Sequence, residues 1–258
     1  MANPPSCTGT GPQCHGLDVT LRCASLDDGP GSADHEATWL LGHTERIDFG
    51  PLVRHGAELR CAAYVAVPCR FAEVTGPLVH CRAHGFGGPA PAPKREPAAR
   101  RLGGDRFGLV QNGTLETVDL GRASAGLPVL NGDNPCATAR CQTADHRIGA
   151  ACCRDLQITI LCGPEEVELE SLVRARKSPY LCKVGRESPD SLGAEVISAC
   201  AFLGDDGITC GLHGRHRHDH RSAKPDLCFD WPGPGDVYHK GCVFQPQDHT
   251  KRLTNNDL

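Results

Sequence analysis

Sixteen cysteines carry the most specific chemistry in this chain. Thiolates are soft ligands, and four of them complete either a tetrahedral zinc site or the protein ligation of an iron–sulfur cluster. In an oxidising compartment the same residues form disulfides instead. The N-terminal segment MANPPSCTGTGPQC has neither a basic region nor an apolar run, so it does not predict secretion. We therefore expect a cytoplasmic protein whose cysteines bind metal.

The cysteines lie in two copies of one sequence pattern. CHGLDVTLRC at 14–23 matches CRDLQITILC at 153–162 without a gap, and both cysteines, one leucine and one threonine are identical. Downstream, CRFAEVTGPLVHCRAHG at 69–85 matches CAFLGDDGITCGLHG at 200–214 as C-x-F, a turn, and then [VI]-x-C-x-x-H-G. Because both matches occur in the same order, they indicate an internal duplication.

The duplication gives most cysteines a counterpart. Cys61 is paired with Cys182 because each lies between the two matched segments of its own half. The full correspondence sets Cys7, Cys14, Cys23, Cys61, Cys69 and Cys81 against Cys141, Cys153, Cys162, Cys182, Cys200 and Cys210. The remaining cysteines all lie in the second half and are Cys136, Cys152, Cys228 and Cys242.

Local patterns predict one strand and one helix in each copy. Apolar residues at 17, 19 and 21 alternate with polar residues at 18, 20 and 22, which is typical of a half-buried strand. PEEVELESLVRAR from Pro164 predicts a helix, and DHEATWLL from Asp34 predicts its counterpart. Between the copies, RFGLVQNGTLETVDL predicts a hairpin that turns at Asn112-Gly113.

Composition indicates a small core. Aromatic residues make up only 5% of the chain, while glycine (30) and proline (20) are abundant. We therefore expect a small, irregular α+β fold of two pseudo-symmetric lobes, stapled by metal. The expected organisation is an N-terminal cysteine repeat at 1–88, a linker and hairpin at 89–134, and a C-terminal cysteine domain at 135–258.

Charge and hydropathy exclude two classes of partner. A net charge of -4 argues against nucleic acid, whose phosphates require clustered lysines and arginines. No apolar run approaches the roughly 18 residues of a membrane helix. Metal ions are the expected partners.

The second half resembles the YkgJ-type cysteine-cluster family, described as zinc- or iron-chelating proteins and including a flagellin lysine N-methylase. The resemblance covers about 135–232 and rests on the vicinal Cys152-Cys153 pair, the PEEV helix start, CAFLGDDGITCGLH, and KPDLCFDWP, where Lys224 replaces the family's arginine. It implies that the metal ligands of the second half come from Cys136, Cys141, Cys152, Cys153, Cys182, Cys200, Cys210 and Cys228. The repeat extends the candidate ligands to Cys14, Cys23, Cys61, Cys69 and Cys81.

We therefore expect a protein that holds iron–sulfur clusters, iron or, as the alternative, zinc. His84 and His213 stand three residues after matched cysteines and could either ligate metal or hydrogen-bond locally. No GxGxxG, P-loop, G-x-S-x-G or H-E-x-x-H motif occurs, so no catalytic residue is predicted. Two alternatives stay open: an iron-dependent redox or group-transfer enzyme, and a disulfide-stapled exported protein.

Overall fold

The computed structural model describes residues 14–27, 30–43, 46–75, 78–83, 85, 87–89, 106–119, 149–150, 152–162, 167–217, 220–225 and 228.

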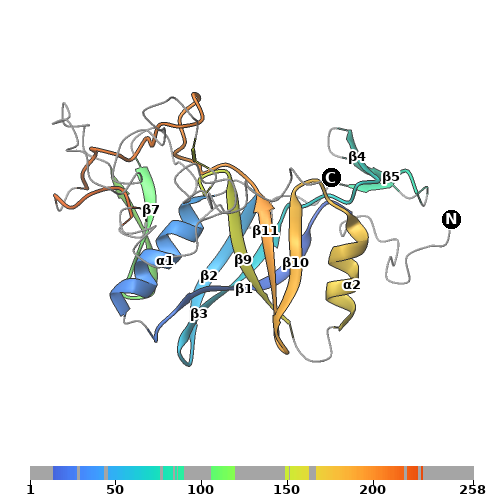
Figure 1. Ribbon diagram of the computed structural model, residues 1–258, viewed down its shortest axis with the longest axis horizontal. Helices are drawn as coiled ribbons and strands as arrows, with labels where there is room; N and C mark the ends of the chain where they lie inside the picture. The colour runs from blue at the N-terminus through green and yellow to red at the C-terminus, as the bar shows by residue number, and fades with distance from the viewer. Residues whose placement is uncertain are drawn as a thin grey trace, which may run out of the picture.

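A six-stranded antiparallel sheet dominates the molecule (Figure 1). The first repeat contributes β1 (Leu17–Ser25), α1 (Pro30–His43), β2 (Ile47–His55) and β3 (Glu58–Val65). The second repeat contributes β9 (Asp155–Leu161), α2 (Val167–Arg176), β10 (Leu181–Ser188) and β11 (Ser191–Ile197). The strand order β10-β11-β9-β1-β3-β2 is symmetric about the β1–β9 pair, so each repeat supplies half of the sheet in the same strand-helix-strand-strand order.

The two halves of the sheet are related by a pseudo-twofold axis between β1 and β9. Leu21 and Ile160 hold the same position in the matched segments, and they lie opposite each other in the β1–β9 ladder. Each then pairs with the following inner strand of its own repeat, Leu21 with Cys61 and Ile160 with Leu192. The strand segments that were matched by sequence, 14–23 and 153–162, are thus equivalent in the structure, and so are the hairpins β2–β3 and β10–β11 that follow them.

One cysteine pairing predicted from the sequence is wrong. Cys61 lies on the inner strand β3, and its structural counterpart on β11 is Leu192. Cys182 lies on the edge strand β10, opposite Glu195, and its counterpart on the edge strand β2 is Asp48. Both cysteines fell between matched segments, but strand order and register decide which residues are equivalent.

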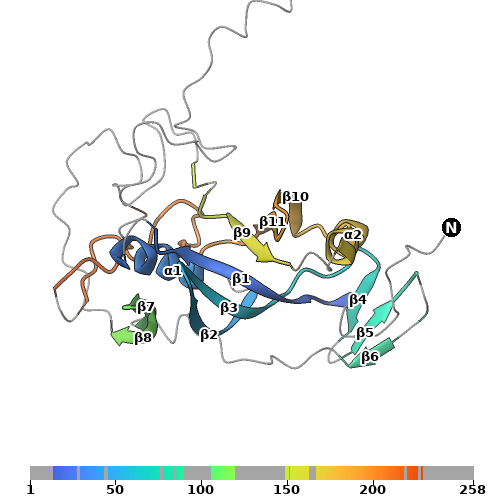
Figure 2. The ribbon, with the colours of Figure 1, turned by 90° about the horizontal axis from the view of Figure 1, so that it is seen from below.

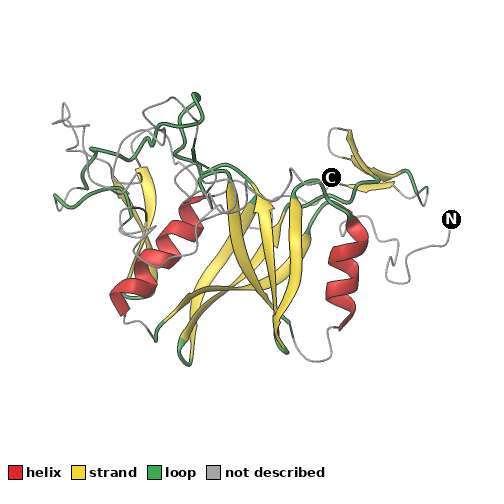
Figure 3. Cartoon of the chain, viewed as in Figure 1, coloured by secondary structure: helices red, strands yellow, loops and turns green. Residues whose placement is uncertain are grey.

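The expected α+β class is also wrong, because the described residues form mostly antiparallel β-sheet with two helices (Figure 3). The fold is not irregular either, and the two repeats share one sheet instead of forming two lobes. Each half-sheet alone would leave its apolar face half covered, whereas joining β1 to β9 merges both faces into one continuous core.

The core lies on one face of this sheet, under both helices. The alternation predicted for 17–23 is confirmed, because Leu17 and Leu21 are buried while the polar residues at 18, 20 and 22 are exposed. From α1, Leu40 and Leu41 pack into the cluster, and from α2 it is Val173. Aliphatic and small side chains therefore build a core in spite of the few aromatic residues.

The predicted hairpin is confirmed and packs against α1. It consists of β7 (Arg106–Gln111) and β8 (Thr114–Asp119), with positive φ at Asn112 (50°) and Gly113 (72°) as a two-residue turn requires. The Asp34 carboxylate accepts hydrogen bonds from the amides of Asn112 (2.6 Å) and Gly113 (2.9 Å). The helix carrying Asp34 starts earlier than predicted, at Pro30, where a proline fits the first turn.

A small sheet of β4 (Ala72–Thr75), β5 (Leu78–Cys81) and β6 (Gly87–Pro89) lies at the α2 end of the molecule (Figure 2). The β7–β8 hairpin lies at the opposite end, beside α1. The predicted start of the second helix, from Pro164 to Glu166, falls outside the described residues, where α2 is first seen at Val167. In the described ranges no helix has the length and apolar character needed to cross a membrane.

Candidate metal centre

Four cysteines of the second repeat gather where β9 begins and β11 ends. Cys153 precedes β9, and its carbonyl oxygen accepts a hydrogen bond of 2.6 Å from the amide of Cys200, which follows β11. Cys210 stands opposite Leu203 across an antiparallel bridge, so the turn between them returns Cys210 toward Cys200. Cys228 is the last of the four in the sequence. These residues are called the second-repeat thiol group below.

The turn that carries Cys210 is held by its own polar residues. The amide of Gly204 donates to the carbonyl of Thr209 (2.7 Å), and the Asp206 carboxylate accepts hydrogen bonds from the amides of Ile208 (3.0 Å) and Thr209 (2.8 Å). The Arg154 guanidinium, next to Cys153, donates to the carbonyl of Gly207 (3.0 Å). The sequence GDDGIT therefore forms a defined turn that fixes both flanking cysteines.

Backbone amides follow each of two cysteines closely. The amides of Leu203 and His213 donate to the carbonyl oxygens of Cys200 (3.0 Å) and Cys210 (3.2 Å). The amides of Phe202 and Leu203 act to lower the pKa of Cys200, and those of Leu212 and His213 act to lower the pKa of Cys210, against the larger effect of burial. In both cases these amides belong to the second and third residues after the cysteine. Amide donors favour the anionic thiolate over the neutral thiol.

The four thiols are electrostatic neighbours. Burial, followed by the charge of Cys153, raises the pKa of Cys200 to about 12. Burial also raises the pKa of Cys228 well above its ordinary value, and the charges of Cys153, Cys200 and Cys210 add to the rise. The charge of Cys153 therefore acts on all three of the other thiols, and ionisation of one thiol opposes ionisation of its neighbours unless a cation lies between them.

A buried ammonium lies beside these thiols. Lys224 is only 5% exposed, and its charge opposes the burial that raises the pKa of Cys210 and Cys228. Burial, and then the Lys224 charge, lower the pKa of His213. Nearby anions stabilise a buried ammonium, and thiolates would act as such anions.

The four sulfurs are neighbours without being closed around one point. Among the described residues, no three His, Cys, Asp or Glu side chains are gathered tightly enough to hold a metal ion. The donor set nevertheless suits a soft metal, because sulfur ligands and amides that favour thiolates match zinc or an iron–sulfur cluster. Binding would require the thiols to deprotonate and turn toward a shared centre.

The first repeat has the same backbone arrangement around Cys14, Cys69 and Cys81. Each such arrangement of three cysteines is called a cysteine frame below. The amide of Cys69 donates to the carbonyl of Cys14 (2.8 Å), as Cys200 does to Cys153. Cys81 lies opposite Ala72 in the β4–β5 ladder, as Cys210 lies opposite Leu203. The duplication thus reproduces the positions of three cysteines.

A buried arginine binds the first-repeat cysteine segments to the second repeat. Arg176, at the end of α2, is 4% exposed, and its guanidinium donates to the carbonyl oxygens of Gly16 (3.0 Å) and Val67 (3.4 Å). These carbonyls stand two residues from Cys14 and Cys69. Sequence reasoning identified neither this role of Arg176 nor the burial of Lys224. The position of Lys224 four residues before Cys228 was the one feature of the sequence that could have indicated its place beside the thiols.

Of the other candidate ligands in the described ranges, four make contacts outside these groups, and Cys152 adjoins Cys153. Cys23 and Cys61 form a buried pair in the core. Cys162 is buried near the Arg186 guanidinium (3.6 Å), and Cys182 donates to the Glu195 carboxylate (3.7 Å). Cys152 is half-buried next to Cys153. Cys136, Cys141, Cys7, Cys242 and His84 lie outside the described residues.

Comparisons of this chain with protein-family models, with curated proteins and with solved structures found no match.

Proposed function

We propose that the chain is a cytoplasmic metal-binding protein whose second repeat holds an iron–sulfur cluster, or alternatively zinc, through Cys153, Cys200, Cys210 and Cys228. The observation that carries this proposal is the pair of turns in which the amides two and three residues after Cys200 and Cys210 favour the thiolate forms of these cysteines. Such amides stabilise thiolate ligands and orient them toward a metal. The resemblance of 135–232 to the YkgJ-type family agrees with it.

The charge balance of the second-repeat thiol group supports the same function. Four thiolates around zinc or around an iron–sulfur cluster leave a net negative charge. The buried ammonium of Lys224 would neutralise part of that charge from within the site. Burial raises the pKa of these thiols, and a bound cation would counteract that rise. A coordinating thiol loses its proton because the metal ion stabilises the thiolate.

The chain's own residues would supply ligation and shielding. Cys200 and Cys210 would ligate from the two rigid turns, Cys153 from the start of β9, and Cys228 would close the site. Metal binding would then hold the end of the sheet to the segments after β11, because ligands from distant parts of the chain bind one centre. The first repeat has three equivalent cysteines, and a second centre there would need a further ligand.

Metal content after anaerobic purification tests the proposal. We expect brown protein with iron, inorganic sulfide and broad visible absorption, whereas colourless protein with stoichiometric zinc would identify the alternative metal. Cys200→Ser and Cys210→Ser should each lower metal content and the urea midpoint together. Cys182→Ser is the matched control, since Cys182 is also half-buried but donates to Glu195 outside the thiol group.

Full metal content in both Cys200→Ser and Cys210→Ser would contradict this assignment. Cys81→Ser, in the equivalent position of the first repeat, should have a smaller effect than Cys210→Ser. Thiol titration of metal-stripped protein in denaturant distinguishes the metal-binding protein from the alternative of a disulfide-stapled exported protein. A count near zero would establish disulfides.

A further inference from the structure

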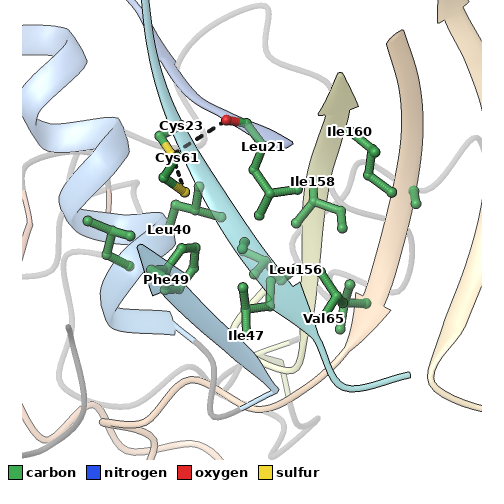
Figure 4. Packing of buried hydrophobic residues seen from close by; sticks show 14 of the residues in the cluster. Leu21, Cys23, Leu40, Ile47, Phe49, Cys61, Val65, Leu156, Ile158 and Ile160 are labelled. Atoms are coloured by element: carbon green, nitrogen blue, oxygen red, sulfur yellow. Dashed lines mark hydrogen bonds between the residues drawn. The ribbon is translucent and has the colours of Figure 1, made fainter. Parts of the chain in front are cut away.

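Two core cysteines of the first repeat form a close pair that the proposed metal centre does not use. The sulfurs of Cys23 on β1 and Cys61 on β3 are 3.2 Å apart (Figure 4). Both side chains are almost fully buried, at 2% and 1% exposure, beneath α1. Cys23 lies six residues along β1 from Leu17, about 20 Å at the usual rise of a strand, so the pair is remote from Cys14.

A β-bulge lies at Cys23. Arg22 lies opposite Arg60 and Ala24 opposite Leu59, so Cys23 is an extra residue without a direct partner in the ladder. Cys61 lies opposite Leu21, two residues before Cys23. Both cysteine side chains are buried in the core, where the Cys23 thiol also lies 3.9 Å from the Leu21 carbonyl.

The second repeat lacks this arrangement. Cys162 is the counterpart of Cys23, but Leu192 stands where the first repeat has Cys61. The β9–β11 ladder also runs without a bulge. The pair is therefore a feature of the first repeat alone and not a remnant of the shared cysteine pattern.

We propose that Cys23 and Cys61 are a site of reversible disulfide formation that cross-links β1 to β3 within the core. A disulfide requires the sulfurs to approach to about 2.05 Å. The pair therefore has to close by only about 1.1 Å, and no strand has to be exchanged. The bond would join residues 38 positions apart and restrict the unfolded chain accordingly.

The oxidant is a hydroperoxide, with hydrogen peroxide as the simplest member. The thiolate of one cysteine attacks a peroxide oxygen, the O–O bond breaks, and a sulfenic acid and hydroxide form. The second thiolate then attacks the sulfenyl sulfur, so that the S–S bond forms and the S–O bond breaks. The two thiol protons leave with the two oxygens as water, and the two electrons lost by sulfur reduce the peroxide.

Burial makes this reaction slow in the closed fold. The hydrogen bond to Cys61, followed by burial, raises the pKa of Cys23 far above its ordinary value, so little thiolate is present. Oxidation therefore proceeds from forms in which α1 has opened away from β1 and β3. Reduction of the buried disulfide likewise proceeds from these open forms.

The test is oxidation of the full-length protein with hydrogen peroxide over a range of urea concentrations below the unfolding transition. Free thiols are then alkylated, and non-reducing peptide mapping identifies linked cysteines. We expect a Cys23–Cys61 linkage whose rate of formation rises with urea and which dithiothreitol reverses. The oxidised protein should unfold at a higher urea concentration than the reduced protein.

Matched variants make the outcome specific. Cys162→Ala alters the counterpart of Cys23, so it should leave the linkage and the gain in urea midpoint intact. Cys61→Ala and, independently, Cys23→Ala should abolish both. The inference is overturned if both cysteines are still free to be alkylated after oxidation in urea. It is also overturned if Cys23 links to another cysteine, or if the linkage leaves the urea midpoint unchanged.

Discussion

Leu21 and Ile160 face each other across the β1–β9 ladder and hold the same position in the two repeats. The pseudo-twofold axis of the sheet passes between them. Because β1 and β9 are antiparallel, Cys14 before β1 and Cys153 before β9 lie at opposite ends of the sheet. The two cysteine frames are therefore separate sites, each at the end where its own repeat begins (Figure 1).

The axis residues should dominate the stability of the sheet. Leu21 and Ile160 are 0% and 1% exposed, so Leu21→Ala and Ile160→Ala should each lower the free energy of unfolding by about 2–5 kcal/mol. Because the two side chains are neighbours, the double variant should depart from the sum of the single changes by about 0.5–3 kcal/mol. Urea denaturation of the four proteins measures this coupling.

An exposed residue of the same sheet provides the control. Val53 on β2 is 59% exposed, so Val53→Ala should change the free energy of unfolding by no more than about 0.5 kcal/mol. Equal losses in Val53→Ala and Leu21→Ala would show that the β1–β9 junction is not the centre of the core.

Gly16 should tolerate no side chain. A β-carbon there would lie closer than 3.0 Å to the Tyr64 ring and to the Val65 carbonyl, in the segment whose carbonyl accepts from Arg176. Gly16→Ala should therefore lower the thermal midpoint by several degrees, since overpacking typically costs about 1–3 kcal/mol. Gly185→Ala is the matched change, because nothing lies within 4 Å of its β-carbon. Similar midpoints for the two variants would contradict the close packing at Gly16.

Lys224 should matter for metal retention if the second-repeat thiol group holds metal. Lys224→Met keeps an unbranched side chain, shorter by one atom, but removes the buried positive charge. We expect a chelator to remove metal from this variant at about a 10–100-fold lower concentration, as for other groups that support metal ligands. Lys177→Met, at an exposed site, serves as the control. Unchanged chelator resistance in Lys224→Met would separate this ammonium from the metal centre.

Tyr64 should weaken the fold at high pH. Burial raises its pKa from 10 to about 12, with the Arg176 charge acting in the opposite direction. Between these values the unfolded chain has lost the phenol proton and the folded chain has kept it, so the free energy of unfolding falls as pH rises through this window. Below pH 10 both states are protonated and the contribution is fully present.

The measurement is urea denaturation at pH 9, 10, 11 and 12 for the native chain and for Tyr64→Phe. The variant loses the 2.8 Å hydrogen bond to His15, which lowers stability at every pH, but it also loses this titration. The difference in stability between the two proteins should therefore shrink as pH rises above 10. A constant difference would show that Tyr64 ionises equally in both states.

The sequence by itself determined the local elements and the duplication. The alternation at 17–23, the Asn112-Gly113 turn and the matched C-x-F and C-x-x-H segments are encoded in neighbouring residues, so their periodicity and spacing could be recognised directly. The same spacing matched Cys153, Cys200 and Cys210 with Cys14, Cys69 and Cys81. These features depend on the backbone over a few residues.

Only the tertiary structure decided how the repeats combine and which cysteines meet. The β1–β9 junction converts two incomplete half-sheets into one core, which is why composition wrongly suggested an irregular fold. Cys23, at a bulge in β1, contacts Cys61, 38 residues away, and Arg176 reaches Gly16 across 160 residues. Strand register and side-chain burial arise from packing between distant segments, and no local pattern in the sequence specifies them.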